Sequence, residues 1–156
     1  MINLSAFGYE EKLKSPGKAF AKTFSNNSFI NGPAVKEFET AFAEFTGAKD
    51  CVAVSSCTSA LQLSLLALSI GPGDEVITVP YTWVSTVEAI KQVGATPIFV
   101  DINATDLCID VGQIRNVITE RTKAILPVDL YGTVSNIDAL KKFNLPIVQD
   151  AAQSTG

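Results

Sequence analysis

The sequence has 156 residues, of which 47% are apolar and 18% are charged, and it carries a net charge of −4 with an isoelectric point near 4.8. This length and apolar content predict one folded domain with its own core and exclude a disordered tail. The acidic balance argues against nucleic-acid binding. No apolar run approaches the ~20 residues of a membrane span, and the N-terminus shows no pattern of a signal peptide. We therefore expect a cytoplasmic protein.

The first predicted element is a helix over residues 32–47, GPAVKEFETAFAEFTG. Pro33 suits a first helical position, and Gly47 suits a C-terminal cap. Three phenylalanines recur at helical spacing and form one apolar stripe: Phe38, Phe42 and Phe45. Such a stripe favours packing in the core over a ligand site.

Strand and helix patterns alternate after this helix. Short apolar runs predict strands at 51–56, 75–79, 96–102, 123–130 and 145–150. Helical patterns occupy the segments between them, at 58–70, 81–94, 110–122 and 135–144. Apolar runs without polar alternation are typical of strands that are covered on both faces. We therefore predict an α/β fold with a doubly wound, mainly parallel sheet and helices on both faces.

Ligands of open α/β sheets bind beyond the carboxyl ends of the strands, so the corners between strand and helix are the candidate site. The sequence has four such corners: SSCTS at 55–59, PYTW at 80–83, DLYG at 129–132 and DAAQ at 150–153.

The first corner places hydroxyl groups and free backbone N–H groups at the start of a helix, which is an arrangement that binds anions. Thr58 and Ser59 could add side-chain donors to a phosphate. The alternative is simple capping of the helix by Ser55 or Ser56. The corner lacks the glycine patterns of dinucleotide-binding folds and of P-loops.

The second and fourth corners carry an aromatic pair and a carboxylate. Tyr81 and Trp83 could stack on a planar ring, although core packing is the alternative reading. Asp150 follows a buried strand, and a buried carboxylate needs a partner, which could be a helix terminus or a cationic ligand atom. A ligand that suits all three corners has a phosphate, a flat ring and a positive ring atom, and pyridoxal 5′-phosphate (PLP) has all three.

The chain has no histidine and three cysteines, Cys51, Cys57 and Cys108. Without histidine this chain cannot build a His-based zinc site, a Ser-His-Asp triad or a Cys-His dyad. The odd number of cysteines and the lack of a C-x-x-C pair favour three reduced and mostly buried thiols.

Over nearly its whole length the chain resembles the DegT-type (StrS-like) sugar aminotransferases, which have the type I PLP-transferase fold. The matching blocks keep one order along the chain: INGPAVKEFETAFAEFTGAKDCVAVSSCTSALQLSLLAL, GPGDEVITVPYTWVSTVEAI, GATPIFVDI, TKAILPVDLYG and LPIVQDAAQSTG. Ordered blocks are far more specific than any one corner.

The resemblance implies a cofactor site made of six residues: Cys57, Thr58, Ser59, Trp83, Asp150 and Gln153. The first three would hold the phosphate of PLP, and Trp83 would stack on its pyridine ring. Asp150 would pair with the pyridine nitrogen, and Gln153 would contact the phenolic oxygen of the ring.

The resemblance also implies a reaction and its partners. The family moves an amino group, usually from glutamate, to a keto group on a nucleotide-linked sugar, and its members are typically homodimers. Residues 1–156 would form the N-terminal portion of the PLP-binding large domain, with an N-terminal arm or helix at 1–32 and an α/β core at 33–156. The small C-terminal domain of the family is absent from these residues.

Two positions depart from the family pattern. Cys57 stands where the family often has glycine, and a thiol at a helix N-terminus could be activated. Asp129 stands where the family often has histidine, which leaves an acid near the edge of the cofactor.

The family's Schiff-base lysine lies downstream of the corner at 150–153, beyond Gly156. We therefore expect the chain to be inactive alone and to need a complementing C-terminal segment. Two alternatives stay open: a relative that uses pyridoxamine phosphate (PMP) for sugar dehydration, and a non-catalytic binding or oligomerisation fragment.

Overall fold

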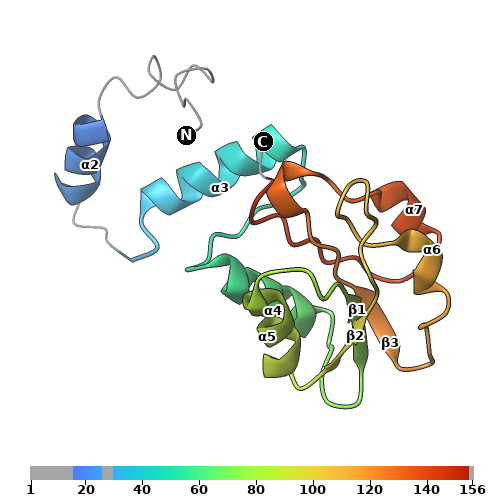
Figure 1. The fold of residues 1–156 in the computed structure, drawn as a ribbon. Coiled ribbons are helices and arrows are strands. Elements are labelled where there is room, and N and C mark those ends of the chain that lie inside the picture. Colours follow the sequence, from blue (N-terminus) through green and yellow to red (C-terminus); the bar gives the residue numbers. More distant parts are fainter. Residues whose placement is uncertain (1–15, 26–29, 155–156) are drawn as a thin grey trace. The chain divides into compact units, whose positions relative to one another are not determined.

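The computed structural model describes residues 16–25 and 30–154, and these divide into two compact units between Ala53 and Val54 (Figure 1). The first unit contains α2 (Pro16–Ser25) and α3 (Pro33–Thr46). Helix α3 begins at Pro33 and ends at Thr46, and it is capped by Gly47, whose φ of 70° lies in the left-handed region that glycine tolerates. The helix predicted over 32–47 is therefore confirmed.

The phenylalanine stripe on α3 is present, but the prediction that it packs in a core is wrong. Phe38 is 53% exposed and Phe45 is 69% exposed, while Phe42 is half-buried between them. The ring centroids lie 5.5 Å apart for Phe38 and Phe42 and 6.3 Å apart for Phe42 and Phe45. Periodicity correctly predicted one shared face, but it carries no information about what covers that face.

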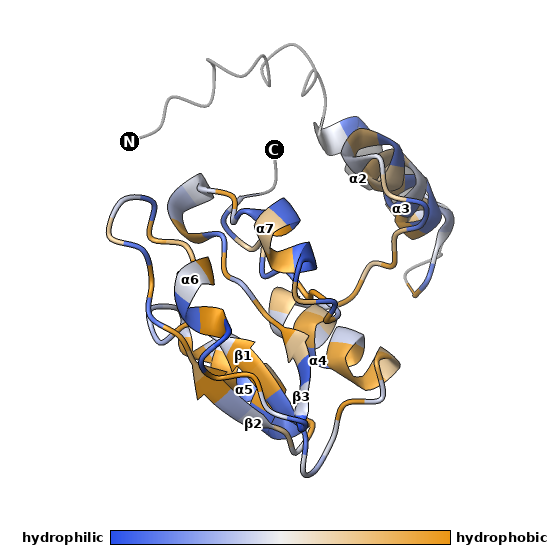
Figure 2. Cartoon of the chain, turned by 90° about the vertical axis from the view of Figure 1, so that its right-hand side faces the viewer, coloured by the Kyte–Doolittle hydropathy of each residue, from blue (hydrophilic) through white to orange (hydrophobic). Residues whose placement is uncertain are grey.

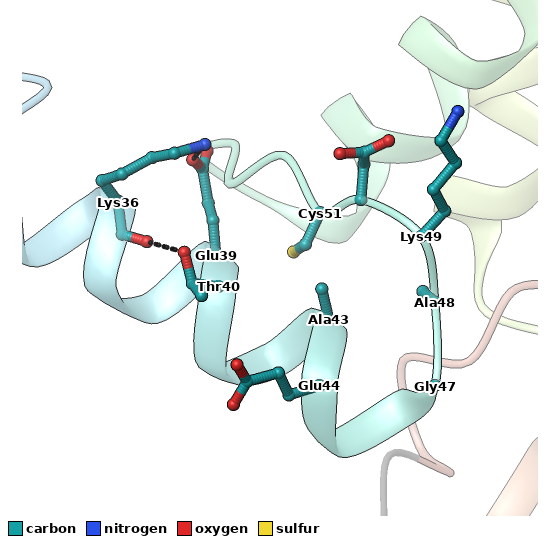
Figure 3. Close-up of a pocket in the computed structure, with 10 residues that line it drawn as sticks. Lys36, Glu39, Thr40, Ala43, Glu44, Gly47, Ala48, Lys49 and Cys51 are labelled. Atoms are coloured by element: carbon teal, nitrogen blue, oxygen red, sulfur yellow. Dashed lines mark hydrogen bonds and ion pairs between the residues drawn. The ribbon is translucent and has the colours of Figure 1, made fainter.

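A hollow of about 420 Å³ lies beside α3 within the first unit. Figure 3 shows the Cys51 sulfur directed toward Ala43 and the Lys36 ammonium beside the carboxylate of Glu39. The Lys36 Nζ and Glu39 Oε2 atoms are 3.5 Å apart. None of the six predicted cofactor residues lines this hollow.

The strand predicted at 51–56 does not form. Its residues lie outside any described ladder, and the Ala53 N–H donates to Glu39 Oε1 at 2.9 Å instead of to a neighbouring strand. Val52 is 77% exposed and Val54 is 38% exposed. Because a strand exists only through its pairing, an apolar run without a neighbour stays an extended loop.

The second unit is a parallel sheet with helices. The described elements are α4 (Cys57–Ala67), β1 (Glu75–Thr78), α5 (Val84–Gln92), β2 (Thr96–Phe99), α6 (Val111–Ile114), β3 (Thr122–Ile125), the 3₁₀ turn η2 (Leu130–Gly132) and α7 (Ile137–Lys141). The strand order is β2-β1-β3, and both pairings are parallel. Figure 1 shows α4 and α5 on one side of the sheet and α6 and α7 on the other. The predicted α/β class is confirmed.

The core follows the central strand. All four residues of β1 are buried, and Figure 2 shows β1 and much of α4 in the hydrophobic colour. Strand β2 is only partly covered, so the expectation of two covered faces is wrong there. Its Pro97 fits this position, because proline lacks the N–H that a central strand needs.

Most predicted elements are shorter in the structure, and two of them show a physical reason. The helix predicted over 110–122 stops at Ile114, because the β-branched residues Val117, Ile118 and Thr119 favour helices poorly. Strand β3 ends before Pro127, which interrupts the ladder. The run at 145–150 still lies parallel beside this strand through the bridges Ile125–Ile147 and Val128–Asp150.

The three cysteines are free thiols, as expected, but only Cys108 is buried; Cys57 is exposed and Cys51 is half-buried. No described helix has the length and apolar character to cross a membrane.

A buried carboxylate lies at the opposite end of the sheet from the predicted site, where β1 and β3 begin. The Glu75 side chain is 5% exposed, and its Oε1 lies 2.6 Å from an Arg121 guanidinium nitrogen. The Thr119 hydroxyl donates to Glu75 Oε2 at 2.5 Å. Removing Arg121 would leave this buried charge with only the hydroxyl donor.

We predict that Arg121→Met lowers the free energy of unfolding by about 1–3 kcal/mol, because a buried carboxylate loses its charged partner. The matched control is Lys141→Met, which removes an exposed ion pair with Asp138 and should cost less than about 0.5 kcal/mol. Urea unfolding of both variants measures the difference. Equal losses in the two variants would contradict a structural role for the Glu75–Arg121 pair.

Candidate functional site

The carboxylate of Asp150 lies where three of the four corners meet. Its backbone bridges to Val128, with the Asp150 N–H donating to Pro127 O at 2.9 Å and the Asp129 N–H donating to Asp150 O at 3.0 Å. These bonds fix Asp150 at the carboxyl end of the sheet. Its side chain reaches the first turn of α4 and the first turn of α5.

Asp150 is 6% exposed, and its two oxygens accept from neutral donors. Oδ2 accepts from the Thr86 hydroxyl at 2.7 Å. Oδ1 accepts from the Cys57 thiol at 3.6 Å and from the Ala152 N–H at 3.3 Å. No described cation forms an ion pair with this carboxylate. Of the two partners that the sequence left open, a helix terminus and a cationic ligand atom, the structure shows neither; a hydroxyl, a thiol and a turn N–H contact the carboxylate, and no described residue supplies a counterion.

Helix α4 is capped as the simpler reading of the first corner predicts. The Ser56 hydroxyl accepts from the Ser59 N–H at 3.1 Å, and the Ser59 hydroxyl lies 3.0 Å from that of Ser56. Among the described residues, the N–H groups of Cys57 and Thr58 have no acceptor. Capping thus engages Ser59 and leaves two adjacent N–H donors at the helix start, where the helix dipole favours an anion.

The Cys57 thiol is not activated, contrary to expectation. Cys57 is exposed as a residue, but partial burial of its sulfur raises the pKa of Cys57 above its ordinary value, and the negative charge and hydrogen bond of Asp150 raise it further. At neutral pH the residue is therefore a thiol that donates to the carboxylate. The helix dipole alone would have favoured the thiolate, but the nearby acid opposes it.

The aromatic residues of the second corner are exposed, so the core-packing alternative is wrong. Trp83 is 76% exposed at the N-cap position of α5, and Tyr81 is 47% exposed. The Tyr81 hydroxyl lies 3.2 Å from the hydroxyl of Tyr131, which joins the second corner to the third. This hydrogen bond to Tyr81 raises the pKa of Tyr131.

Gln153 is oriented by the third corner. Its Oε1 accepts from the Tyr131 N–H at 2.9 Å. Tyr131 has a φ of 56°, a left-handed conformation that side chains other than glycine adopt rarely. Because the amide oxygen is occupied, the amide nitrogen of Gln153 is the end left to donate to a ligand.

Asp129 has a structural role in this chain. It is 1% exposed, and its carboxylate accepts from the Ser135 N–H at 2.9 Å, from the Ser154 hydroxyl at 3.1 Å and from the Gln149 amide. The acid expected at the edge of the cofactor is therefore turned inward. It ties the loop after η2 to the residues around Asp150.

The structure thus brings Cys57 and Asp150 into contact and links Gln153 to the third corner. Trp83 has no described contact with Asp129 or Asp150. Its carbonyl accepts from the Thr86 N–H at 3.2 Å, and the Thr86 hydroxyl in turn contacts Asp150. No described group of His, Cys, Asp and Glu residues could hold a metal ion.

Sequence reasoning missed Thr82, Thr86 and Tyr131. Thr86 is 1% exposed, and it lies on the inward face of α5 with Ala89 and Ile90. The available signal was a polar residue, Thr86, on the apolar inward face of a helix, one turn after the corner at 80–83.

Comparisons with known proteins identify the family of this chain. The model of the DegT/DnrJ/EryC1/StrS aminotransferase family matches residues 12–156. The chain is 42% identical over 139 residues to a UDP-2-acetamido-2-deoxy-3-oxo-D-glucuronate aminotransferase of Pseudomonas aeruginosa, covering 86% of this chain and 39% of that protein. It is 43% identical over 142 residues to a UDP-4-amino-4-deoxy-L-arabinose–oxoglutarate aminotransferase of Shewanella sediminis, covering 88% of this chain and 37% of that protein.

Solved structures show the same fold. DesV of S. venezuelae, solved with a ketimine intermediate, superposes with a TM-score of 0.90 at 37% identity, covering 97% of this chain and 42% of DesV. NtdA of Bacillus subtilis, solved with bound PMP, superposes with a TM-score of 0.86 at 35% identity, and the match covers 89% of this chain and 33% of NtdA. A GDP-4-keto-6-deoxymannose-3-dehydratase superposes with a TM-score of 0.83 at 34% identity, and the match covers 89% of this chain and 39% of the dehydratase.

The chain spans about two fifths of the length of these relatives. The match runs through all four corners. The chain therefore belongs to the DegT/DnrJ/EryC1/StrS aminotransferase family.

Proposed function

We propose that this chain is the cofactor-binding portion of a PLP-dependent aminotransferase that moves an amino group from glutamate to a keto group on a nucleotide-linked sugar. The observation that carries the proposal is Asp150, a buried carboxylate without a described counterion at the carboxyl end of the sheet. A protonated pyridine nitrogen would supply the positive charge that this carboxylate lacks.

The phosphate end of the cofactor fits the start of α4. The N–H groups of Cys57 and Thr58 have no acceptor within the described residues, and the Thr58 hydroxyl adds a donor at the same turn. Ser59 supports this turn through its bonds to the Ser56 cap. Anions at helix starts are stabilised by such N–H groups and by the helix dipole.

The ring end fits the other corners. Trp83 offers an exposed flat face for stacking, and the amide nitrogen of Gln153 donates toward the phenolic oxygen. When bound, the ring acts as an electron sink for bonds broken at the amine carbon. Asp150 supports that role because its charge keeps the ring nitrogen protonated.

No described lysine contacts Asp150, so we propose that another segment of the protein contributes the lysine and that the protein forms a homodimer. Residues 1–156 are then the N-terminal portion of the large domain. The sugar-nucleotide relatives and the acidic composition support a cytoplasmic biosynthetic enzyme.

A PMP-dependent sugar dehydratase is the second candidate, because a dehydratase is among the structural neighbours. The two functions use the same phosphate and ring contacts in this chain. The residue at the lysine position separates them.

The first prediction tests binding in the chain itself. At a PLP concentration ten times its dissociation constant, alkylation of Cys57 by iodoacetamide should slow by about tenfold, because the ligand covers the thiol at the phosphate corner. Peptide mass spectrometry measures each cysteine separately. Cys51, which lies in the first unit, is the internal control and should react at an unchanged rate.

Pyridoxine, which has the ring without the phosphate, should protect Cys57 far less than PLP. If PLP left the alkylation of Cys57 unchanged, or slowed Cys51 equally, the phosphate corner would be assigned wrongly.

The second prediction tests the reaction. In a polypeptide that joins residues 1–156 to a lysine-bearing remainder, PLP and glutamate should yield PMP and 2-oxoglutarate, and a nucleotide-linked keto-sugar should return the cofactor to PLP. Asp150→Asn should slow PMP formation by about 100-fold or more, because the ring nitrogen loses its anion.

Stopped-flow absorbance of the cofactor measures the formation of PMP, and mass analysis of the sugar measures its amination. Formation of PMP followed by loss of water from the sugar, without amination, would favour the dehydratase. An Asp150→Asn variant as fast as the unmodified chain would contradict the proposal.

A further inference from the structure

The two oxygens of Asp150 lie in different surroundings. Oδ2 faces the interior, where the donor is Thr86, a residue only 1% exposed. Oδ1 faces the exposed Cys57 thiol and the N–H of Ala152. A ligand that enters from solvent therefore meets Oδ1 first.

A chain of hydroxyl groups holds the inner oxygen. An ionised carboxylate can only accept, so the single hydroxyl proton of Thr86 is donated to Asp150. The Thr82 hydroxyl lies 2.9 Å from that of Thr86, and Thr86 has no proton left to give it. The order of donation is therefore Thr82 to Thr86 to Asp150, and each bond in such a chain strengthens the next.

This use of a helical threonine is not the ordinary one. Near a helix start, a threonine hydroxyl commonly bonds the backbone of its own helix three or four residues away. The Thr86 hydroxyl instead reaches a side chain 64 positions along the sequence. The contact joins α5 to the corner at 150–153, so it fixes the carboxylate relative to the helix that carries Trp83.

We propose that Thr86 is a positioning residue that fixes Oδ2 of Asp150, so that Oδ1 is presented to the ring nitrogen of the cofactor, with Thr82 orienting the Thr86 hydroxyl. Without cofactor, the Cys57 thiol occupies the donor position on Oδ1. The cofactor part of this inference rests on the proposed function. The anchoring of Asp150 by Thr86 does not.

Three variants separate anchoring from packing. Thr86→Val removes the hydroxyl and keeps the shape, whereas Thr86→Ser keeps the hydroxyl and loses the methyl group. Thr78→Val is the matched control, because Thr78 is fully buried and its hydroxyl bonds the Leu126 carbonyl at 2.8 Å rather than Asp150.

The first measurement uses the chain without cofactor. Partial burial raises the pKa of the Cys57 thiol, and the charge and hydrogen bond of Asp150 raise it further, so the alkylation rate of Cys57 against pH reports whether the carboxylate is in place. In Thr86→Val the unanchored carboxylate turns away, and the midpoint should fall toward that of Asp150→Asn. Thr86→Ser and Thr78→Val should keep the original midpoint.

A Thr86→Val variant with the original midpoint would overturn the anchoring. So would a Thr78→Val variant whose midpoint moves as far as that of Thr86→Val.

The second measurement compares PMP with its 1-deaza analogue, which has carbon in place of the ring nitrogen. The unmodified chain should bind PMP more tightly, as measured by quenching of Trp83 fluorescence. Thr86→Val should weaken the binding of PMP by about tenfold and leave the deaza analogue unchanged, because only PMP uses Oδ1. Thr86→Ser should retain the preference for PMP.

The outcomes separate the two proposals. If the unmodified chain has no preference for PMP, the proposed function fails, and the thiol profile still decides whether Thr86 anchors Asp150. If the preference exists and Thr86→Val retains it, or if both ligands weaken equally, the positioning role is overturned.

Discussion

The parallel bridge between Val128 and Asp150 is the interaction on which the candidate site depends. Pro127 has no N–H and interrupts the ladder of β3, yet its carbonyl accepts from Asp150, and the Asp129 N–H returns a bond to the Asp150 carbonyl. The N–H and the carbonyl of Asp150 are therefore both bonded to the segment at 127–129, at the sheet's carboxyl end. Everything that defines the site, from the α4 start to the α5 start, is positioned relative to that residue.

The bridge places a negative charge where water is largely excluded. Burying a carboxylate costs free energy unless donors or a cation compensate it. Asp150 has a hydroxyl, a thiol and a turn N–H, which are neutral donors and leave its charge uncompensated. Asp129, whose N–H donates directly to the Asp150 carbonyl, also accepts only from neutral donors, but these donors tie its own loops together. Asp150 differs because its Oδ1 faces the exposed Cys57 thiol.

The sequence predicted the parts of this arrangement that are local. The helix from Pro33 to Gly47, the central strand and the strand-end corners follow from spacing and capping residues. The sequence of the corner at 55–59 predicted a helix cap or an anion site. Ser56 provides the cap, while the N–H groups of Cys57 and Thr58 stay without an acceptor in the described structure.

The parts that failed depend on distant neighbours. The run at 51–56 has a strand's composition but no described strand to pair with, and the stripe containing Phe38 has nothing described to cover it. Thr86 was missed because its partner is 64 positions away in the sequence. Asp129 was expected at the edge of the cofactor, because local sequence does not reveal that the loop after η2 donates to its carboxylate. Cys57 was expected to be activated because the helix start is local, whereas the opposing charge of Asp150 is not.

The central claim is that Asp150 holds a protonated pyridine nitrogen, and nitrogen NMR of PMP labelled at the ring nitrogen tests it most directly. Bound to this chain, the ring nitrogen should give the chemical shift of the protonated form at a pH where free PMP has lost that proton. Asp150→Asn should return the shift to that of the neutral ring. A neutral ring nitrogen in the bound cofactor of the unmodified chain would contradict the account.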